Sequence, residues 1–146
     1  MRLWRQLLFA LAIGGSPALH PAERQVVLVV SAESPVQQLE PIEVQKLFLG
    51  WPVARDNHTL RPVRNVSDAA LSDVFLQYVV AMSQSAYDRR ILAQVLQQGR
   101  PRPLELAKSS EVIKALSTDR YAVSYMWLND VPANPRLRVI RVLWAQ

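Results

Sequence analysis

The sequence predicts an α/β fold built as one domain, and three observations support this prediction. Residues 25–31 form a continuous run rich in valine, which is typical of a strand covered on both faces. Apolar residues from Leu71 to Met82 recur at the spacing of an amphipathic helix. The chain has 146 residues, of which 50% are hydrophobic, enough for one ordinary domain with a packed core.

Two further elements are expected in the first half of the chain. Pro41 is tolerated in a first helical turn and Gly50 ends a helix readily, so the sequence predicts a helix over residues 41–49. Residues 59–65 are extended in character. Because Pro62 has no N–H, this segment should lie at a sheet edge or be paired only briefly.

The amphipathic helix is expected over residues 69–82. Ser67 or Asp68 can cap it, since either side chain can accept a hydrogen bond from a free amide of the first turn. A second helix is expected to open with a cap at Ser85 and to end at Gly99.

The last third of the chain holds one more helix and two strands. The link at residues 100–103 alternates arginine and proline, and it should be extended and solvated. Ser109 or Ser110 can cap the third helix, and residues 121–126 and 137–143 are strand candidates.

The N-terminus has the pattern of an export signal. Two arginines precede an apolar run at residues 7–13, and Ser16 and Ala18 occupy the −3 and −1 positions of a signal-peptidase site. A membrane anchor, the alternative, needs roughly 20 apolar residues, more than this run has. The sequence predicts a signal peptide at 1–18 and a mature domain at 19–146, in a bacterial periplasm or secreted further.

The composition excludes several kinds of chemistry. The absence of cysteine excludes disulfides and thiolate metal sites. His20 and His58 have no partner at metal-ligand or catalytic spacing, and the two glycines after the leader cannot form a glycine-rich phosphate loop. Without its leader the chain has fifteen basic and twelve acidic residues, a net charge of +3 that is low for a nucleic-acid reader. A non-enzymatic protein without metal or cofactor is therefore expected.

The basic residues before the amphipathic helix suggest an oxyanion site. An extended segment carrying two arginines runs directly into the helix start, where free amides and the positive end of the helix dipole can hold an anion. Guanidinium groups bind phosphate or sulfate in a bidentate manner. The alternative is that these arginines are solvated or paired with a nearby acid. The candidate ligand-binding residues are Arg61, Arg64, Ser67, Asp68, Ala69 and Ala70.

The order of several segments resembles the phosphate ABC transporter substrate-binding protein family, in its short form with little more than a PBP-like domain. The likeness covers about residues 25–126. The segments that carry it are residues 26–30 with 34–36, Gln45-Lys46-Leu47-Phe48-Leu49-Gly50, residues 61–65 before Phe75-Leu76, residues 99–103, and residues 110–112 with 121–125. The resemblance implies a periplasmic-binding-protein-like fold of type 2, a compact domain with a mixed sheet flanked by helices. In this family an anion lies among helix N-termini, hydroxyl groups and an arginine.

The sequence also departs from that family. The long helix of phosphate binders begins with a Gly-Ser-Gly-Thr type turn, whereas residues 66–70 read Val-Ser-Asp-Ala-Ala. Ser67 replaces one hydroxyl donor, and Asp68 repels a fully ionised anion unless it accepts a proton from the ligand. Tyr121 and Ser124 replace two glycines of the late strand. The chain is also too short for a complete two-lobed receptor.

Two functions from different classes stay open. The first is a periplasmic binding protein for phosphate or a similar oxyanion, linked to ABC-type uptake through a membrane permease. The second is a degenerate PBP-like domain that binds an envelope protein, with exposed aromatic residues as contacts. Neither involves nucleic acid or a membrane-spanning mature chain. The aromatic candidates, which have ordinary packing as their alternative role, are Trp51, Tyr121, Trp127 and Trp144.

Overall fold

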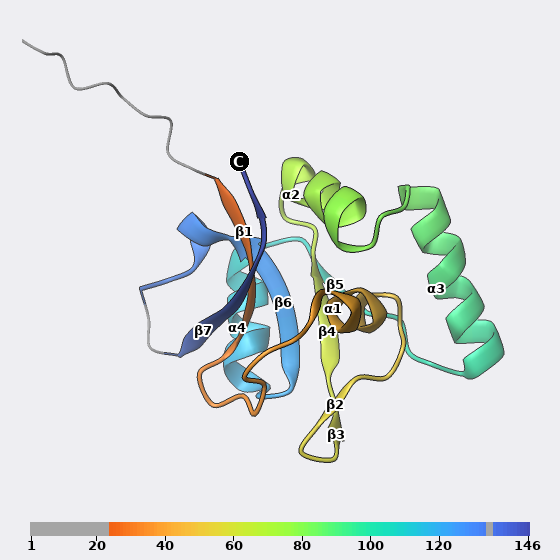
Figure 1. Cartoon of the computed structure of the whole chain (residues 1–146), viewed down its shortest axis with the longest axis horizontal. Helices are drawn as coiled ribbons and strands as arrows, with labels where there is room; N and C mark the ends of the chain where they lie inside the picture. Colours follow the sequence, from red (N-terminus) through yellow and green to blue (C-terminus); the bar gives the residue numbers. More distant parts are fainter. Residues whose placement is uncertain (1–23, 134–135) are drawn as a thin grey trace, which may run out of the picture.

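The computed structural model describes residues 24–133 and 136–146, and the predicted signal peptide lies outside this part of the chain. Five strands form one sheet in the order β5-β4-β6-β1-β7 (Figure 1). The strands are β1 (Gln25–Ser31), β4 (Arg61–Asn65), β5 (Leu104–Leu106), β6 (Ala122–Trp127) and β7 (Leu137–Ala145), and a separate hairpin joins β2 (Ala54–Arg55) to β3 (His58–Thr59). The helices are α1 (Pro41–Phe48), α2 (Ala69–Val74), the π-helix η1 (Phe75–Val79), α3 (Gln84–Gln98), α4 (Ser109–Thr118) and the 3₁₀ turn η2 (Leu128–Asp130).

The sheet is mixed, as the resemblance implied. Strand β1 pairs antiparallel with both β6 and β7, whereas β4 pairs parallel with both β5 and β6. Because β4 and β5 run in the same direction as β6, their carboxyl ends lie at one edge of the sheet. The predicted α/β class with helices flanking a mixed sheet is confirmed.

The valine-rich run in β1 is buried on both faces, as predicted. Val26, Leu28 and Val30 belong to the larger apolar core, which packs the sheet against α1, α2, η1 and α3. Val27 and Val29 belong to a second core beneath α4. Since side chains alternate along a strand, helices on both faces require an unbroken apolar run. Strand β1 nevertheless pairs antiparallel with both of its neighbours, and a continuous apolar run does not reveal the direction of pairing.

The predicted helix over residues 69–82 is divided. It begins as α2, continues as the π-helix η1 and ends before Ala81, which has a φ of 54°. Leu71, Val74 and Phe75 nevertheless lie on the buried face that the periodicity predicted. The apolar spacing identified the correct face, but it did not reveal the change in winding.

Two predicted helix caps are wrong. Helix α3 begins at Gln84, and the hydroxyl of Ser83, not Ser85, accepts a hydrogen bond from the Ala86 amide at 3.2 Å. Lys108 is the N-cap of α4, so Ser109 is the first helical residue and its side chain does not cap the helix. Gly99 ends α3 with a φ of 62°, as expected.

Strand β4 lies inside the sheet, and its pairing with β6 is short. Only Arg61 and Pro62 pair with β6, which agrees with the brief pairing expected around a proline. The other neighbour, β5, was not predicted, because the prolines before it indicated a solvated link. Three residues of β5 pair with Val63, Arg64 and Asn65.

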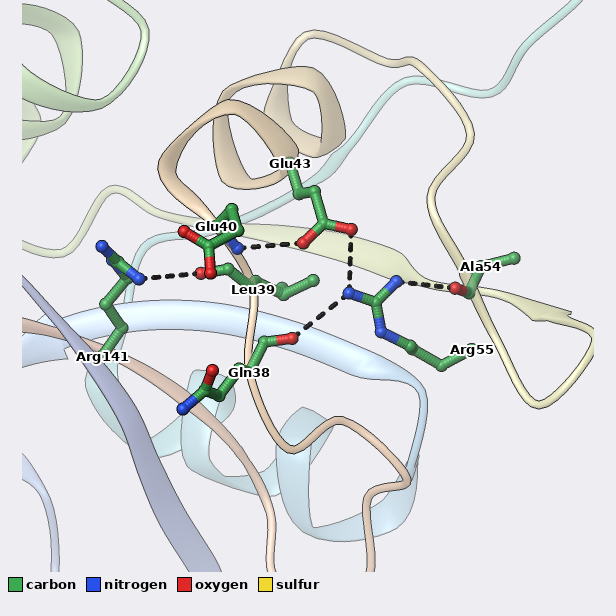
Figure 2. A network of polar contacts seen from close by, with 7 residues as sticks. All are labelled: Gln38, Leu39, Glu40, Glu43, Ala54, Arg55 and Arg141. Carbon is green, nitrogen blue, oxygen red and sulfur yellow. Dashed lines mark hydrogen bonds and ion pairs between the residues drawn. The ribbon is translucent and has the colours of Figure 1, made fainter.

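An arginine network fixes the segment between β1 and α1 (Figure 2). The Arg55 guanidinium donates to the Gln38 carbonyl at 3.2 Å and to Glu43 Oε1 at 2.9 Å. The other carboxylate oxygen of Glu43 accepts from the Glu40 amide at 2.9 Å, and Arg141 donates to the Leu39 carbonyl at 3.2 Å. The hairpin and β7 thereby hold the entry to α1 from two sides.

Candidate functional site

The neighbouring parallel strands β4 and β5 are followed by helices that lie on opposite faces of the sheet. Strand β4 is followed by α2, which packs in the larger core, whereas β5 is followed by α4, which covers the other face. The carboxyl ends of β4 and β5 therefore form a topological switch point. In open α/β sheets, ligands bind in the crevice at such points.

Two serines meet at this switch point. Ser67, which follows β4, and Ser109, which begins α4, have hydroxyl oxygens 3.3 Å apart. Asn65 holds Ser67 in place, since its Oδ1 accepts from the Ser67 hydroxyl at 2.5 Å and from the Ser67 amide at 3.1 Å. The buried Asn65 amide group donates in turn to the Tyr125 carbonyl at 3.0 Å. We call the Ser67–Ser109 region, with the first turn of α4, the switch-point site.

Helix α4 supplies a positive end to the switch-point site. It has ten residues and no side-chain cap, because its N-cap is Lys108. The first amides of a helix have no partner within the helix, and they carry a partial positive charge. Lys108 adds a full positive charge, while Glu111 places a carboxylate in the same turn. Two hydroxyl groups and the first amides of α4 therefore lie at the switch-point site, and Lys108 and Glu111 place opposite charges in the same turn.

Asp68 occupies the amides at the start of α2. Its Oδ1 accepts from the amides of Ala70 at 2.7 Å and Leu71 at 3.4 Å, and its Oδ2 accepts from Trp127 Nε1 at 2.9 Å. The Trp127 hydrogen bond, with those of the two amides, holds the pKa of Asp68 below its usual value. Asp68 also borders a polar hollow of about 260 Å³ beside Arg24, whose guanidinium lies 4.2 Å from the centre of a Trp127 ring.

Replacing Asp68 by alanine should lower the free energy of unfolding by about 1–2 kcal/mol at neutral pH, the usual cost of a lost N-cap. Because the folded state lowers the pKa of Asp68, its stabilisation is present above the unfolded pKa and is lost as the pH falls. Urea titrations from pH 7 to pH 3 should show the wild type and the variant converging in acid. Asp73→Ala, an exposed change on the same helix, is the control. A constant difference at every pH would contradict this role for Asp68.

The structure places Arg64 away from the switch-point site. Its side chain is only 2% exposed, and the guanidinium lies 4.6 Å from the ring centres of both Phe75 and Tyr87. Its Nη1 forms an ion pair with Glu105 Oε1 at 3.1 Å. Arg64 thus lies in an aromatic cage beneath α3 and is not directed at the first turn of α2.

Arg61 lies at the opposite end of β4 from Ser67. Its guanidinium donates two hydrogen bonds to the Asp119 carboxylate, at 2.6 and 2.5 Å, which lowers the pKa of Asp119. Of the six predicted site residues, the structure brings together Ser67, Asp68, Ala69 and Ala70, and it separates the two arginines from them. That these six residues bind an anion stays a prediction.

Sequence reasoning missed Asn65, Lys108 and Ser109 as parts of a site. The signal for Ser109 was present, because this serine was already a candidate for the helix start. Its meeting with Ser67, 42 residues earlier, depends on the parallel pairing of β4 with β5, and β5 was not predicted.

The four aromatic candidates differ in exposure. Trp51 is exposed, Trp127 is buried, and Tyr121 and Trp144 are half-buried. Tyr121 stacks on the exposed His58 ring at 4.5 Å, and Trp144 packs against Trp127 at 6.1 Å. Across residues 24–133 and 136–146, no helix combines the length and apolar character needed to cross a membrane.

Comparisons with known proteins show the fold. No protein-family model matches the chain, and no curated protein sequence is significantly similar to it. The solved structures similar to it include one from Clostridium perfringens, named as a phosphate ABC transporter substrate-binding protein with bound phosphate. It has a TM-score of 0.61 and 10% identity, over 82% of this chain and 45% of that chain.

Two further structures are similar at the same level. PstS from Borrelia burgdorferi has a TM-score of 0.57 and 12% identity, over 81% of this chain and 47% of that one. An ABC-type phosphate transport receptor from Vibrio cholerae has a TM-score of 0.51 and 11% identity, over 82% and 46%. This chain spans less than half the length of each of these proteins. It shares the fold of the matched part of these phosphate ABC transporter substrate-binding proteins, as the resemblance in its sequence predicted.

Proposed function

We propose that this protein is an exported, non-enzymatic solute-binding domain that holds phosphate or a similar oxyanion at the switch-point site and serves ABC-type uptake. The observation that carries the proposal is the meeting of Ser67 and Ser109, with hydroxyl oxygens 3.3 Å apart, at the carboxyl ends of β4 and β5. A related fold with bound phosphate supports the ligand class. The predicted leader and the named transport role of these structures support export and a permease partner.

The chemistry of the switch-point site suits a small anion. Phosphate oxygens accept hydrogen bonds, and Ser67, Ser109 and the first amides of α4 can donate them. The Ser67 hydroxyl donates to Asn65 in this structure, so it has to rotate toward a ligand. Asp68, next to Ser67, is held in its charged form and disfavours a fully ionised anion. Phosphate, which keeps a proton at neutral pH, should therefore bind better than sulfate.

Removing one serine hydroxyl from the switch-point site should weaken phosphate binding about tenfold, because a lost hydrogen bond to a charged group costs about 1.5 kcal/mol or more. Isothermal titration calorimetry of the wild type, Ser67→Ala and Ser109→Ala with phosphate and sulfate measures this directly. Ser85→Ala, an exposed change in α3, should bind as the wild type does. Titrations without heat at millimolar phosphate, or equal affinities in all variants, would reject the site.

A second candidate function is protein binding, and an exposed apolar patch favours it. Ile42, Tyr78 and Val142 are 56%, 55% and 50% exposed, and they border one hollow of about 530 Å³ beside the edge strand β7. Apolar patches next to a sheet edge suit a protein partner. Under this function, envelope extracts should yield a crosslinked partner that Tyr78→Lys loses, and the phosphate titrations should be silent.

A further inference from the structure

Another hollow lies at the amino-terminal ends of β4 and β5, opposite the switch-point site. It has a volume of about 620 Å³, within the usual range for small-molecule sites. The end of α1 with Trp51, the first residues of β4, the link at 100–103 and the last turn of α4 form its walls. We call this hollow the proline slot, because it is bordered by Pro52, Pro62, Pro101 and Pro103.

The prolines explain why the sheet does not fill this space. Strand β5 begins with Leu104, which pairs with Val63, so the first two residues of β4 have no neighbour on that side. The Val66 amide points toward β5, because it donates to the Leu106 carbonyl. Backbone groups of successive strand residues point to alternate sides, so the backbone of Pro62 also faces the β5 side. Pro62 has no N–H to donate there. An apolar molecule can therefore occupy the proline slot without leaving a Pro62 donor unpaired.

The charges around the proline slot are mostly positive. Its walls contain three arginines and one acid, Asp119, and the two hydrogen bonds from Arg61 already engage that acid. Arg100 donates to the Gly50 carbonyl at 3.3 Å, and its guanidinium lies 5.7 Å from the centre of a Trp51 ring. Arg102 is exposed and forms no ion pair with any residue in 24–133 or 136–146. Among the residues that the structure describes, Arg100 and Arg102 therefore border this mostly apolar hollow without an ion-pair partner.

We propose that the proline slot binds a small apolar monocarboxylate, with its apolar body between Trp51 and the prolines and its carboxylate on Arg100 and Arg102. A guanidinium forms paired hydrogen bonds with a carboxylate, and the exposed apolar wall gains from being covered. Inorganic phosphate matches this slot poorly, because it leaves the apolar wall in contact with water. The site is independent of the switch-point site, which lies at the opposite end of the same strands.

The test compares three probes on the full domain: decanoate, decyltrimethylammonium, which also has a ten-carbon chain but the opposite charge, and inorganic phosphate. Two-dimensional ¹H–¹⁵N spectra should show decanoate shifting the Trp51 indole and the amides of Arg100 and Arg102, with Ser109 unchanged. Decyltrimethylammonium at the same concentration should shift none of them. Phosphate reports separately on the switch-point site, so each proposal can fail without the other.

Calorimetry with decanoate should show a loss of affinity of at least threefold for Arg102→Gln and about tenfold for the double variant Arg100→Gln/Arg102→Gln. Arg89→Gln, which removes an exposed arginine of α3 outside the slot, should bind as the wild type does. Because Arg102 is exposed, Arg102→Gln should leave the fold intact, so its loss of affinity for decanoate reports on the guanidinium and not on misfolding. Equal binding of the cationic probe, unchanged affinity in the double variant, or shifts confined to other surfaces would each overturn the proposal.

Discussion

Replacing Arg64 by alanine should lower the free energy of unfolding by about 2–4 kcal/mol, measured by urea denaturation. The change empties the space that the guanidinium fills against the Phe75 and Tyr87 rings, whose centres each lie 4.6 Å from it, and removes both cation–π contacts. The ion pair contributes less to this loss, because the Glu105 side chain is 55% exposed and returns to water when its partner is removed.

Two controls separate packing from charge. Arg64→Met fills the same space without charge, and it should stay within about 1.5 kcal/mol of the wild type, because it also removes a buried Nε without a hydrogen-bond partner among the described residues. Arg61→Ala, on the same strand, breaks an exposed ion pair and should cost less than about 1 kcal/mol. Equal losses for Arg64→Ala and Arg61→Ala would show that the cage around Arg64 is not formed.

Replacing Phe75 by alanine should be more damaging still, with an expected loss of about 3–5 kcal/mol. Phe75 is fully buried at the start of the π-helix, and its ring stacks on Tyr125 at 4.8 Å. It also meets Phe48 edge-on at 5.4 Å and Tyr87 at 5.5 Å, so it connects α1, α3 and β6. The variant therefore loses apolar burial, three aromatic contacts and one wall of the Arg64 cage.

Tyr78→Ala is the matched control for Phe75. It removes an aromatic ring from the same π-helix, but that ring is 55% exposed, so the loss should be below about 1 kcal/mol. Thermal unfolding followed by circular dichroism should show the same order of variants as urea. A Phe75→Ala protein as stable as Tyr78→Ala would contradict the arrangement of the core.

The fold could be predicted from the sequence where one pattern is decisive. The valine-rich run of β1 has to be covered on both faces, and the spacing from Leu71 to Met82 can face a core only as a helix. The direction of pairing could not be obtained in this way, because an apolar run looks the same beside parallel and antiparallel neighbours. The short strand β5 was not predicted, because the prolines that precede it indicated a solvated link.

The candidate site was predictable only in part. Ser67 and Asp68 stand at a helix start, as their side-chain chemistry indicated, but the roles of the two arginines depend on contacts between distant residues. Arg64 is paired with Glu105, 41 positions away, and Arg61 with Asp119, 58 positions away. Sequence spacing shows which residues neighbour one another along a helix or strand, whereas these partners are set by the packing of the sheet.

The most direct measurement is a phosphate titration followed in ¹H–¹⁵N spectra of the domain. If phosphate binds at the carboxyl ends of β4 and β5, the amides of Ser67, Ser109 and Ser110 should shift together and saturate, while those of Arg100 and Arg102 stay in place. Amides at Ser109 and Ser110 that do not move at millimolar phosphate would contradict the proposed function.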